Sequence, residues 1–326
     1  MLEVTFQIGI VDQSNMIPVG DETPRGSDEP APRIQGLDTW PTGDILEALW
    51  HSQSRAVAAC LPALPALARA VEAAIERLRV GTGRLVYAGA GSSGMIAALD
   101  ASDLGATFDW PEQRTVVFVA GGIALTRGPD PTAEDDAVGG RACASDAGLG
   151  PSDVVLGLSA GGTSAYTVAL LDEARQRGAM TIAVAGRAGS PLVRAAEHAV
   201  VVATGAEVIA GSTRLAAGTA QKLVLNLFST AVMVGLGAVF DNLMIDVRPA
   251  NAKLRQRQTA IVASIAEVDP ALAADALTRH GDVKRAVLGL AGMAPDEIDG
   301  ALASTGGNLR VALARIDRGN DRGNPR

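Results

Sequence analysis

Gly, Ser and Thr gather with one acid and one Arg in residues 207–215, which read EVIAGSTRL. An apolar-periodic stretch follows. This composition is typical of a helix start that meets a polar ligand, because free backbone N–H groups and hydroxyls there bind anions or sugars. An ordinary capped core helix has the same composition, since Ser and Thr are common N-cap residues. Glu207, Ser212 and Thr213 are therefore candidate ligand-binding residues, and a capping role stays open.

A second candidate lies in residues 89–94, GAGSSG, which follow a short apolar run and precede a helical pattern. The glycine spacing matches the dinucleotide-binding fingerprint, but that motif also needs an acid at the end of the next strand. The next apolar run ends in VAGG at residues 119–122 and offers no acid. We therefore favour a sugar or phosphate site that uses Ser92 and Ser93 at a helix N-terminus. Tight packing of a glycine turn is the alternative.

A similar loop, SAGGTS, begins at Ser159, follows another apolar run and opens another helical pattern. The hydroxyls of Ser159, Thr163 and Ser164 are candidates for binding phosphate oxygens. The backbone N–H groups of Gly161 and Gly162 are candidates for the same role. The loop therefore predicts a second part of an anion-binding or sugar-binding site.

Two acidic segments are candidates for proton transfer. Residues 100–103 read DASD near the end of the helical pattern after the first glycine loop, and residues 132–136 read TAEDD. Two carboxylates in different environments can act as general acid and general base. Acids near helix ends are also commonly solvated, or stabilised by the helix dipole. Residue types alone leave Asp103 and Glu134 open between these interpretations.

Five short apolar runs predict the strands that position these loops: residues 84–88, 114–120, 153–158, 181–185 and 198–202. Their alternation with helical patterns predicts an α/β fold, a doubly wound parallel sheet with helices on both faces. Ligands bind at the carboxyl ends of strands in such sheets, where both glycine loops fall. Ahead of the sheet, apolar spacing over residues 42–79 predicts two helices that break near Pro62 and Pro65.

Composition divides the chain into four parts. Residues 1–35 are rich in Asp, Gly, Pro and Ser and predict a flexible N-terminal arm. The sheet domain is expected over residues 36–263. Two similar pieces, GDVKRAVL and GNLRVALA, then predict a small C-terminal helical domain over residues 264–317. Residues 318–326, rich in Gly, Asn and Arg, are expected to form a disordered tail.

Overall composition excludes several classes of function. The 326 residues are 48% hydrophobic and carry a net charge of −8, so we expect no nucleic-acid partner. The chain has no uninterrupted apolar run of transmembrane length and no signal-peptide pattern, so we expect no membrane association and a cytoplasmic location. Two Cys and three His form no spaced ligand cluster, so we expect no disulfide framework, no metal and no cofactor.

Together, these motifs resemble the N-acetylmuramic acid 6-phosphate etherases, which are sugar-phosphate lyases of the sugar isomerase (SIS) superfamily. The most specific segments are residues 207–226 and residues 242–253, which contain NLMIDV. The resemblance spans about residues 36–316. It implies removal of D-lactate from C3 of the phosphorylated amino sugar, which leaves N-acetylglucosamine 6-phosphate. It also implies a base that takes the C2 proton and an acid that helps to expel lactate, before water adds back.

The resemblance assigns the base to Glu134, in a matching Ala-Glu-Asp run, and the acid to Asp103, where the family has Glu. Glu207 is a third candidate, either for holding sugar hydroxyls or for proton transfer. The phosphate loop departs from the family, which has SGRT where residues 161–164 read GGTS, and Arg where this chain has Met95. Because a charge-assisted hydrogen bond contributes about 1.5–3 kcal/mol, we expect a lower phosphate affinity than the family pattern implies.

These departures leave two alternatives. One is a divergent paralogue that acts on another amino sugar, and the other is a catalytically silent sugar-phosphate sensor that regulates a partner protein. An aldose–ketose isomerase is disfavoured because no His lies in a candidate loop. The stretch after Gly211 is apolar over more than one helical stripe, which predicts either a homodimer or a central core helix. SIS domains commonly pair, so the resemblance favours a homodimer with a site partly between subunits.

Overall fold

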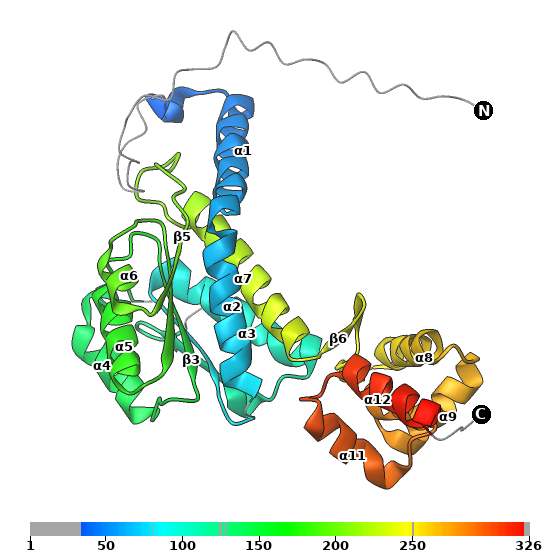
Figure 1. The fold of residues 1–326 in the computed structure, drawn as a ribbon. Coiled ribbons are helices and arrows are strands. Elements are labelled where there is room, and N and C mark those ends of the chain that lie inside the picture. The colour runs from blue at the N-terminus through cyan, green and yellow to red at the C-terminus, as the bar shows by residue number, and fades with distance from the viewer. Residues whose placement is uncertain are drawn as a thin grey trace, which may run out of the picture.

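The computed structural model describes residues 34–79, 81–123, 126, 128, 130–249 and 251–322. Residues 1–33, almost all of the predicted N-terminal arm, lie outside the described residues. Figure 1 shows a larger α/β body and a smaller helical body that follows it in the chain. The larger body carries both glycine loops and is described first.

Five parallel strands form its sheet in the order β2-β1-β3-β4-β5. They are β1 (Leu85–Gly89), β2 (Thr115–Val119), β3 (Val154–Ser159), β4 (Met180–Ala185) and β5 (His198–Val201). Each strand falls on a predicted apolar run, so the predicted parallel α/β fold is confirmed. The pairing places Gly89 beside Leu158. The loops after β1 and β3 therefore leave the same edge of the sheet next to each other.

Helices cover both faces of the sheet (Figure 1). One layer contains α1 (Thr42–Ala59), α2 (Leu64–Arg79), α3 (Gly91–Phe108) and α7 (Ala216–Gly235). The other contains α4 (Ala137–Asp146), α5 (Ala165–Gln176) and α6 (Pro191–Ala195). Along β3, Val154, Leu156 and Leu158 belong to the core of the first layer and Val155 to the core of the second. All four are buried, as expected for a parallel strand covered on both faces.

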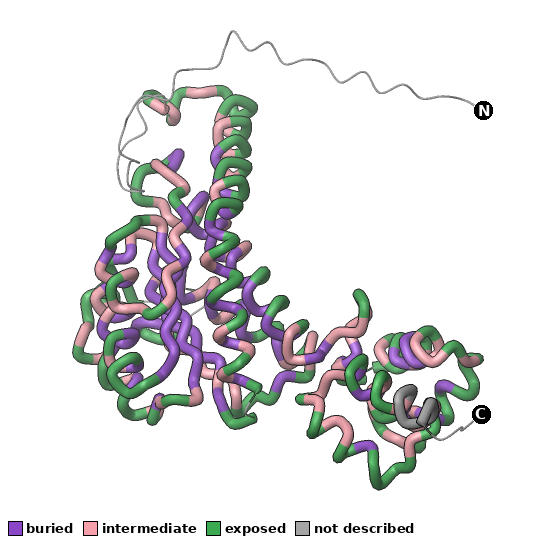
Figure 2. Tube along the Cα trace, in the orientation of Figure 1, coloured by how far each residue is buried: buried purple, intermediate pink, exposed green. Residues whose placement is uncertain are grey.

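The two predicted N-terminal helices are α1 and α2, and the short 3₁₀ helix Leu61–Ala63 separates them at the predicted proline break. Among the described residues, the stretch Thr42–Arg79 alone is long and apolar enough to cross a membrane, by length and composition only. Its second half, α2, buries Leu67, Val71 and Leu78 in the first core. It therefore behaves as the core helix of a globular domain. Figure 2 shows that the upper turns of α1 are largely exposed.

The smaller body is the predicted C-terminal helical domain, and it has a core of its own. It contains α8 (Ala252–Ala266), α9 (Pro270–His280), α10 (Val283–Leu290), α11 (Pro295–Ser304) and α12 (Leu309–Arg322), after a short hairpin of β6 (Val239–Phe240) and β7 (Leu243–Met244). Ile261 and Val262 of α8 lie in this core. The core of this body therefore includes residues before the predicted boundary at residue 264, because Ile245 lies in it and the apolar face of α8 packs against α9 and α10. The tail predicted from residue 318 is helical as far as Arg322.

A buried ion pair fixes the start of β3, the strand that leads to the second loop. The Asp153 carboxylate is 3% exposed and accepts a hydrogen bond from Arg84 Nη2 at 2.6 Å. It also accepts from the backbone N–H groups of Arg84 at 3.1 Å and Gly150 at 3.0 Å. Arg84 in turn donates to the backbone carbonyl of Ala147 at 3.0 Å. These bonds join β1, β3 and the end of α4.

We expect Asp153→Ala to lower the free energy of unfolding by about 3–5 kcal/mol, because it leaves the Arg84 guanidinium without its partner in a largely buried place. Glu173→Ala is the control, since it breaks the more exposed pair of Glu173 with Arg177 and should cost at most about 1 kcal/mol. Urea denaturation of both variants measures the difference. Equal losses would contradict the importance of the Asp153 pair.

Candidate active site

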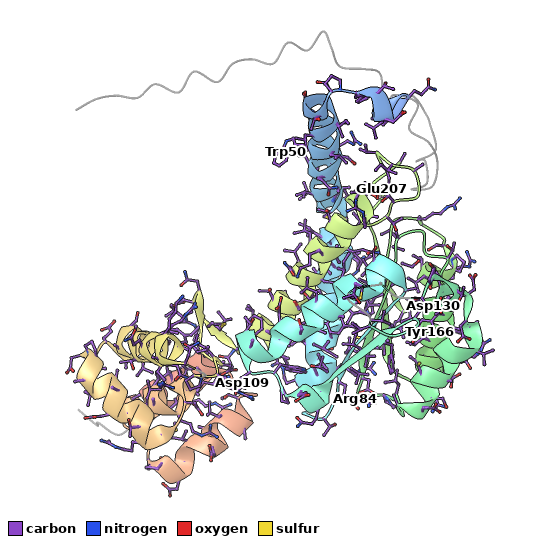
Figure 3. All side chains as sticks on the ribbon, turned by 180° about the vertical axis from the view of Figure 1, so that it is seen from behind. Trp50, Arg84, Asp109, Asp130, Tyr166 and Glu207 are labelled. Carbon is purple, nitrogen blue, oxygen red and sulfur yellow. The ribbon has the colours of Figure 1, made fainter. Side chains whose placement is uncertain are left out.

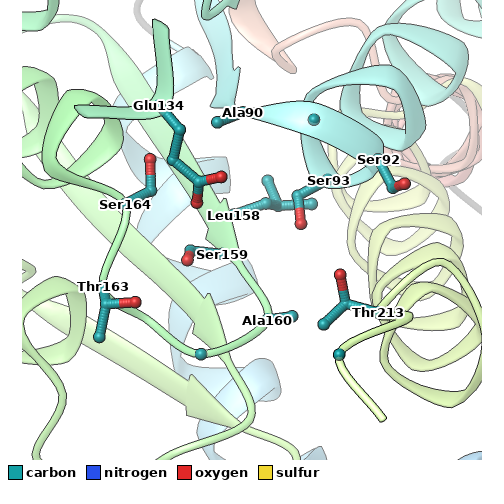
Figure 4. Close-up of a pocket in the computed structure, with 13 residues that line it drawn as sticks. Ala90, Ser92, Ser93, Glu134, Leu158, Ser159, Ala160, Thr163, Ser164 and Thr213 are labelled. Carbon is teal, nitrogen blue, oxygen red and sulfur yellow. The ribbon is translucent and has the colours of Figure 1, made fainter. Parts of the chain in front are cut away.

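A cavity of about 210 Å³ opens at the carboxyl ends of β1 and β3 (Figure 4). Segments that are far apart in the sequence line it: the two glycine loops, the 3₁₀ helix η6 (Pro131–Asp135) and the loop before α7. The lining residues are Ala90, Gly91, Ser92, Ser93, Glu134, Leu158, Ser159, Ala160, Gly161, Thr163, Ser164, Gly211 and Thr213. Most of the residues predicted for the site are thus brought together. Four of them, Asp103, Gly162, Glu207 and Ser212, do not line the cavity.

The first loop turns from β1 into α3 so tightly that Gly89 has no space for a side chain. A Cβ atom on Gly89 would lie 2.8 Å from the backbone nitrogen of Gly94, and Gly91 has a φ of 53°. This turn therefore requires glycine. It brings Ser92 and Ser93 to the N-terminus of an 18-residue helix, where unpaired N–H groups and the helix dipole favour an anion.

The second loop is held by its own hydrogen bonds. Ser159 Oγ and the Ser159 carbonyl both accept from the Gly162 N–H at 3.1 Å. Ser164 caps α5, because its Oγ accepts from the Thr167 N–H at 3.4 Å. Gly162 has a φ of 72°, and a Cβ there would clash with Ser190 Oγ. Gly162 therefore shapes the loop, and its N–H is bonded within the loop, so ligand binding by this N–H stays a prediction.

Glu134 enters the cavity from η6. Asp130 fixes the start of this short helix, because its Oδ1 accepts from the Thr132 N–H at 2.9 Å. Figure 4 shows the Glu134 carboxylate pointing into the cavity, on the side of Ser159 and Ser164. Within the part of the chain that the structure describes, no other carboxylate and no Lys, Arg or His lines the cavity. The cavity thus combines one base with hydroxyls and backbone N–H groups, which suits proton abstraction from a polar, anionic ligand.

Asp103 lies on an exposed face of α3, outside the cavity. It follows Ser92 by eleven positions, which is about 16 Å along the axis of a helix that rises 1.5 Å per residue. This distance greatly exceeds the length of an Asp side chain. Asp103 of the same chain is therefore out of reach of a ligand in the cavity.

A buried polar cluster beside Asp103 was not expected from the sequence. Asp100 is 3% exposed and accepts hydrogen bonds from Tyr87 Oη at 3.1 Å and Ser229 Oγ at 3.3 Å. Lys222 Nζ lies 3.8 Å from the same carboxylate. Burial raises the pKa of Asp100, while these three partners oppose the rise. The cluster connects α3 with β1 and α7. Its residues lie far apart in the sequence, so no local sequence pattern predicts that they come together.

Glu207 caps α7 from inside the protein. It is fully buried, and its two carboxylate oxygens accept from the N–H groups of Ala216 and Ala217, both at 2.9 Å. The capping alternative is therefore correct for Glu207, and the prediction that it binds substrate is not. The backbone carbonyl of Ser212 accepts from the Leu215 N–H at 3.1 Å, in the turn that leads to the helix. Of the residues predicted in this segment, Thr213 reaches the cavity.

We expect Glu207→Ala to lower the free energy of unfolding by about 2–4 kcal/mol, because two buried N–H groups lose their acceptors. Glu207→Gln keeps one acceptor oxygen, so it should lower the free energy of unfolding by a smaller amount. Ser212→Ala, in the same loop, is the control and should stay close to wild type. Chemical denaturation followed by circular dichroism measures all three. Wild-type stability of Glu207→Ala would contradict the capping role.

Two family models match the chain, and both are described as the SIS domain. One matches residues 54–186 and the other residues 144–231, so together they cover the sheet and both glycine loops. Solved structures with a similar fold include the Vibrio vulnificus NanR protein complexed with ManNAc-6P, at 16% identity over 59% of this chain and 64% of that one, with a TM-score of 0.44. A phosphoheptose isomerase from Francisella tularensis is 21% identical over 60% of this chain and 100% of that one, with a TM-score of 0.41. On the two family-model matches, the larger body is a SIS domain.

Comparison with curated relatives identifies the family within the SIS-domain proteins. An N-acetylmuramic acid 6-phosphate etherase from Rubrobacter xylanophilus is 42% identical over 285 residues, which are 87% of this chain and 94% of the relative. Another, from Deinococcus radiodurans, is 40% identical over 292 residues, which are 89% of this chain and 95% of the relative. The chain belongs to the N-acetylmuramic acid 6-phosphate etherase family. The family expected from residues 207–226 and 242–253 is therefore confirmed.

Proposed function

We propose that this chain is a carbon–oxygen lyase that removes D-lactate from N-acetylmuramic acid 6-phosphate and leaves N-acetylglucosamine 6-phosphate. One observation carries the proposal: among the described residues, Glu134 is the only carboxylate that lines a cavity rich in hydroxyls and backbone N–H groups. Family membership supports the same reaction, because relatives about 40% identical over most of the chain bear the etherase name. We propose that the enzyme acts in the cytoplasm.

Glu134 is the proposed general base. The carbonyl of the open-chain sugar acidifies the proton on C2, and the Glu134 carboxylate removes it. The electron pair forms a C2–C3 double bond as the C3–O bond breaks, and lactate leaves with a proton from a general acid. Water then adds to C3 while a proton returns to C2, so atoms and charge balance. The N-termini of α3 and α5, with Ser92, Ser93 and Thr163, are the proposed phosphate site.

No Lys, Arg or His is found among the described residues that line the cavity, and this favours a second candidate, a divergent paralogue of the family. Met95 and Thr163 stand where the etherase pattern has Arg. Neutral donors then hold the phosphate alone, and neutral hydrogen bonds are weaker than charge-assisted ones. An amino sugar with less charge would suit such a cavity. Comparing muramic acid 6-phosphate with muramic acid as substrates separates the two candidates.

We expect Glu134→Gln to lower the rate of lactate release by about 10²–10⁴-fold, because the amide keeps the size of the side chain and cannot take a proton. Asp135→Asn is the control: it changes a neighbouring exposed acid that does not line the cavity, and its rate should be near wild type. An enzymatic lactate assay with the purified variants gives both rates. Near-wild-type turnover of Glu134→Gln would remove Glu134 from the mechanism.

The general acid is proposed to come from a second copy of the chain. Asp103 is the acid that the family resemblance assigns, and it is out of reach of the cavity in its own chain. Large apolar side chains are exposed on two helices of the larger body: Leu46 (61%) and Trp50 (70%), one turn apart on α1, and Leu99 (53%) on α3, one turn before Asp103 (Figure 3 labels Trp50). Contiguous exposed apolar groups are typical of a protein interface, and Leu46 and Trp50 are neighbours on their helix. We propose a homodimer in which Asp103 of the partner subunit reaches the cavity.

Subunit mixing tests this arrangement. Asp103→Asn and Glu134→Gln homodimers should each be nearly inactive. Because a two-fold dimer that combines them contains one intact site, an equal mixture should recover about a quarter of wild-type activity after subunit exchange. A mixture of Glu134→Gln with Glu134→Ala is the control and should recover none. If the first mixture stays inactive while the wild type releases lactate, the acid does not come from the partner.

A further inference from the structure

A groove of about 540 Å³ adjoins the proposed active site, because Thr163 lines both hollows. The other residues of the groove come from α4, α5 and α6, which cover the second face of the sheet. Figure 4 shows Thr163 at the margin of the cavity, across from Thr213. The cavity and the groove therefore meet at the loop between β3 and α5.

Three charged side chains line this groove: Arg141 of α4, Asp172 of α5 and Arg194 of α6. Two of them are bound within the protein. Asp172 accepts a hydrogen bond from Gln176 at 2.9 Å, and Arg194 donates to the backbone carbonyl of Gly189. Arg141 is exposed and forms no hydrogen bond or ion pair with another described residue. Its guanidinium is therefore available to an anionic ligand at this edge of the sheet.

The packing of α4 on α5 brings Arg141 to the start of α5. A Cβ atom on Gly140 would lie 2.2 Å from the Tyr166 carbonyl oxygen, so the two helix backbones touch at the residue before Arg141. Tyr166 is the second residue of α5, and the N-terminus of this helix is part of the proposed phosphate site. Arg141 lines the groove together with Ala165, the first residue of the same helix. A phosphate held at the α5 N-terminus is therefore within reach of the Arg141 guanidinium.

We propose that Arg141 extends past Thr163 and binds the phosphate of the substrate, so that α4 rather than the glycine loop supplies the cation of this site. The inference rests on the proposed function, in which the phosphate binds at the N-termini of α3 and α5. Because Thr163 has a short side chain, a longer one can pass beside it from the groove into the cavity. A guanidinium donates two parallel hydrogen bonds to a phosphate. The contact favours a 6-phosphorylated amino sugar over the less charged sugar of the second candidate.

Isothermal titration calorimetry with N-acetylglucosamine 6-phosphate tests the contact directly. Arg141→Met removes the charge and keeps an unbranched side chain, so the Kd of this ligand should rise by about tenfold or more. Arg257→Met removes an exposed Arg of α8 and is the matched control, with an expected Kd equal to that of the wild type. An unchanged Kd of Arg141→Met would overturn the proposal. Equal affinity of the wild type for this ligand and for N-acetylglucosamine would overturn it as well.

Moving the charge to the loop provides a second test. Arg141→Met/Thr163→Arg places a guanidinium on the loop itself, so it should recover most of the affinity that Arg141→Met loses. No recovery would contradict the position of the proposed contact.

Lactate release distinguishes this inference from the proposed reaction. A contact that binds substrate and transition state equally lowers KM and leaves kcat unchanged, so Arg141→Met should raise KM at a wild-type kcat. A fall in kcat with KM unchanged would contradict a binding role for Arg141. If the wild type releases no lactate, the proposed reaction is wrong, while the calorimetry still decides whether Arg141 binds phosphate.

Discussion

The site depends on two helix N-termini that open at one edge of a parallel sheet. β1 and β3 are neighbours in register, so α3 and α5, which follow them, begin close together. The N–H groups at both helix starts make this edge electropositive, although no cationic side chain is among the described residues that line the cavity. Gly89, Gly94 and Gly162 permit the tight turns there, since a Cβ atom at each would clash with its neighbours. Glu134 can act on a bound sugar only because these two helix starts place the ligand beside it.

Local sequence patterns were enough to predict the parallel sheet and the two helix starts at its edge. Short apolar runs gave the five strands, and the glycine loops gave the two helix starts, because strand burial and turn geometry act within a few residues. Ser92, Ser159 and Thr213 therefore line one cavity as expected. Glu207 shows the limit of this reasoning. The residue types around Glu207 fit both a ligand-binding site and a helix cap. Only the three-dimensional structure shows that the Glu207 carboxylate is buried and caps α7.

Long-range contacts could not be predicted. The Asp100 cluster joins Tyr87, Lys222 and Ser229 from three elements, and no spacing in the sequence connects them. The core of the C-terminal domain includes Ile245, Ile261 and Val262, although the spacing of these residues in the sequence fits either domain. The distance of Asp103 from the cavity is also a property of the whole helix. Because Asp103 cannot reach the cavity of its own chain, its position favours a site that is shared between two subunits.

The central claim is that Glu134 removes the C2 proton of a sugar bound at this edge of the sheet. The most direct measurement follows hydrogen at C2 by NMR while the protein acts on muramic acid 6-phosphate in D₂O. The account predicts that the N-acetylglucosamine 6-phosphate formed carries deuterium at C2 and that Glu134→Gln abolishes this incorporation. Lactate release with the original hydrogen retained at C2 would contradict the account.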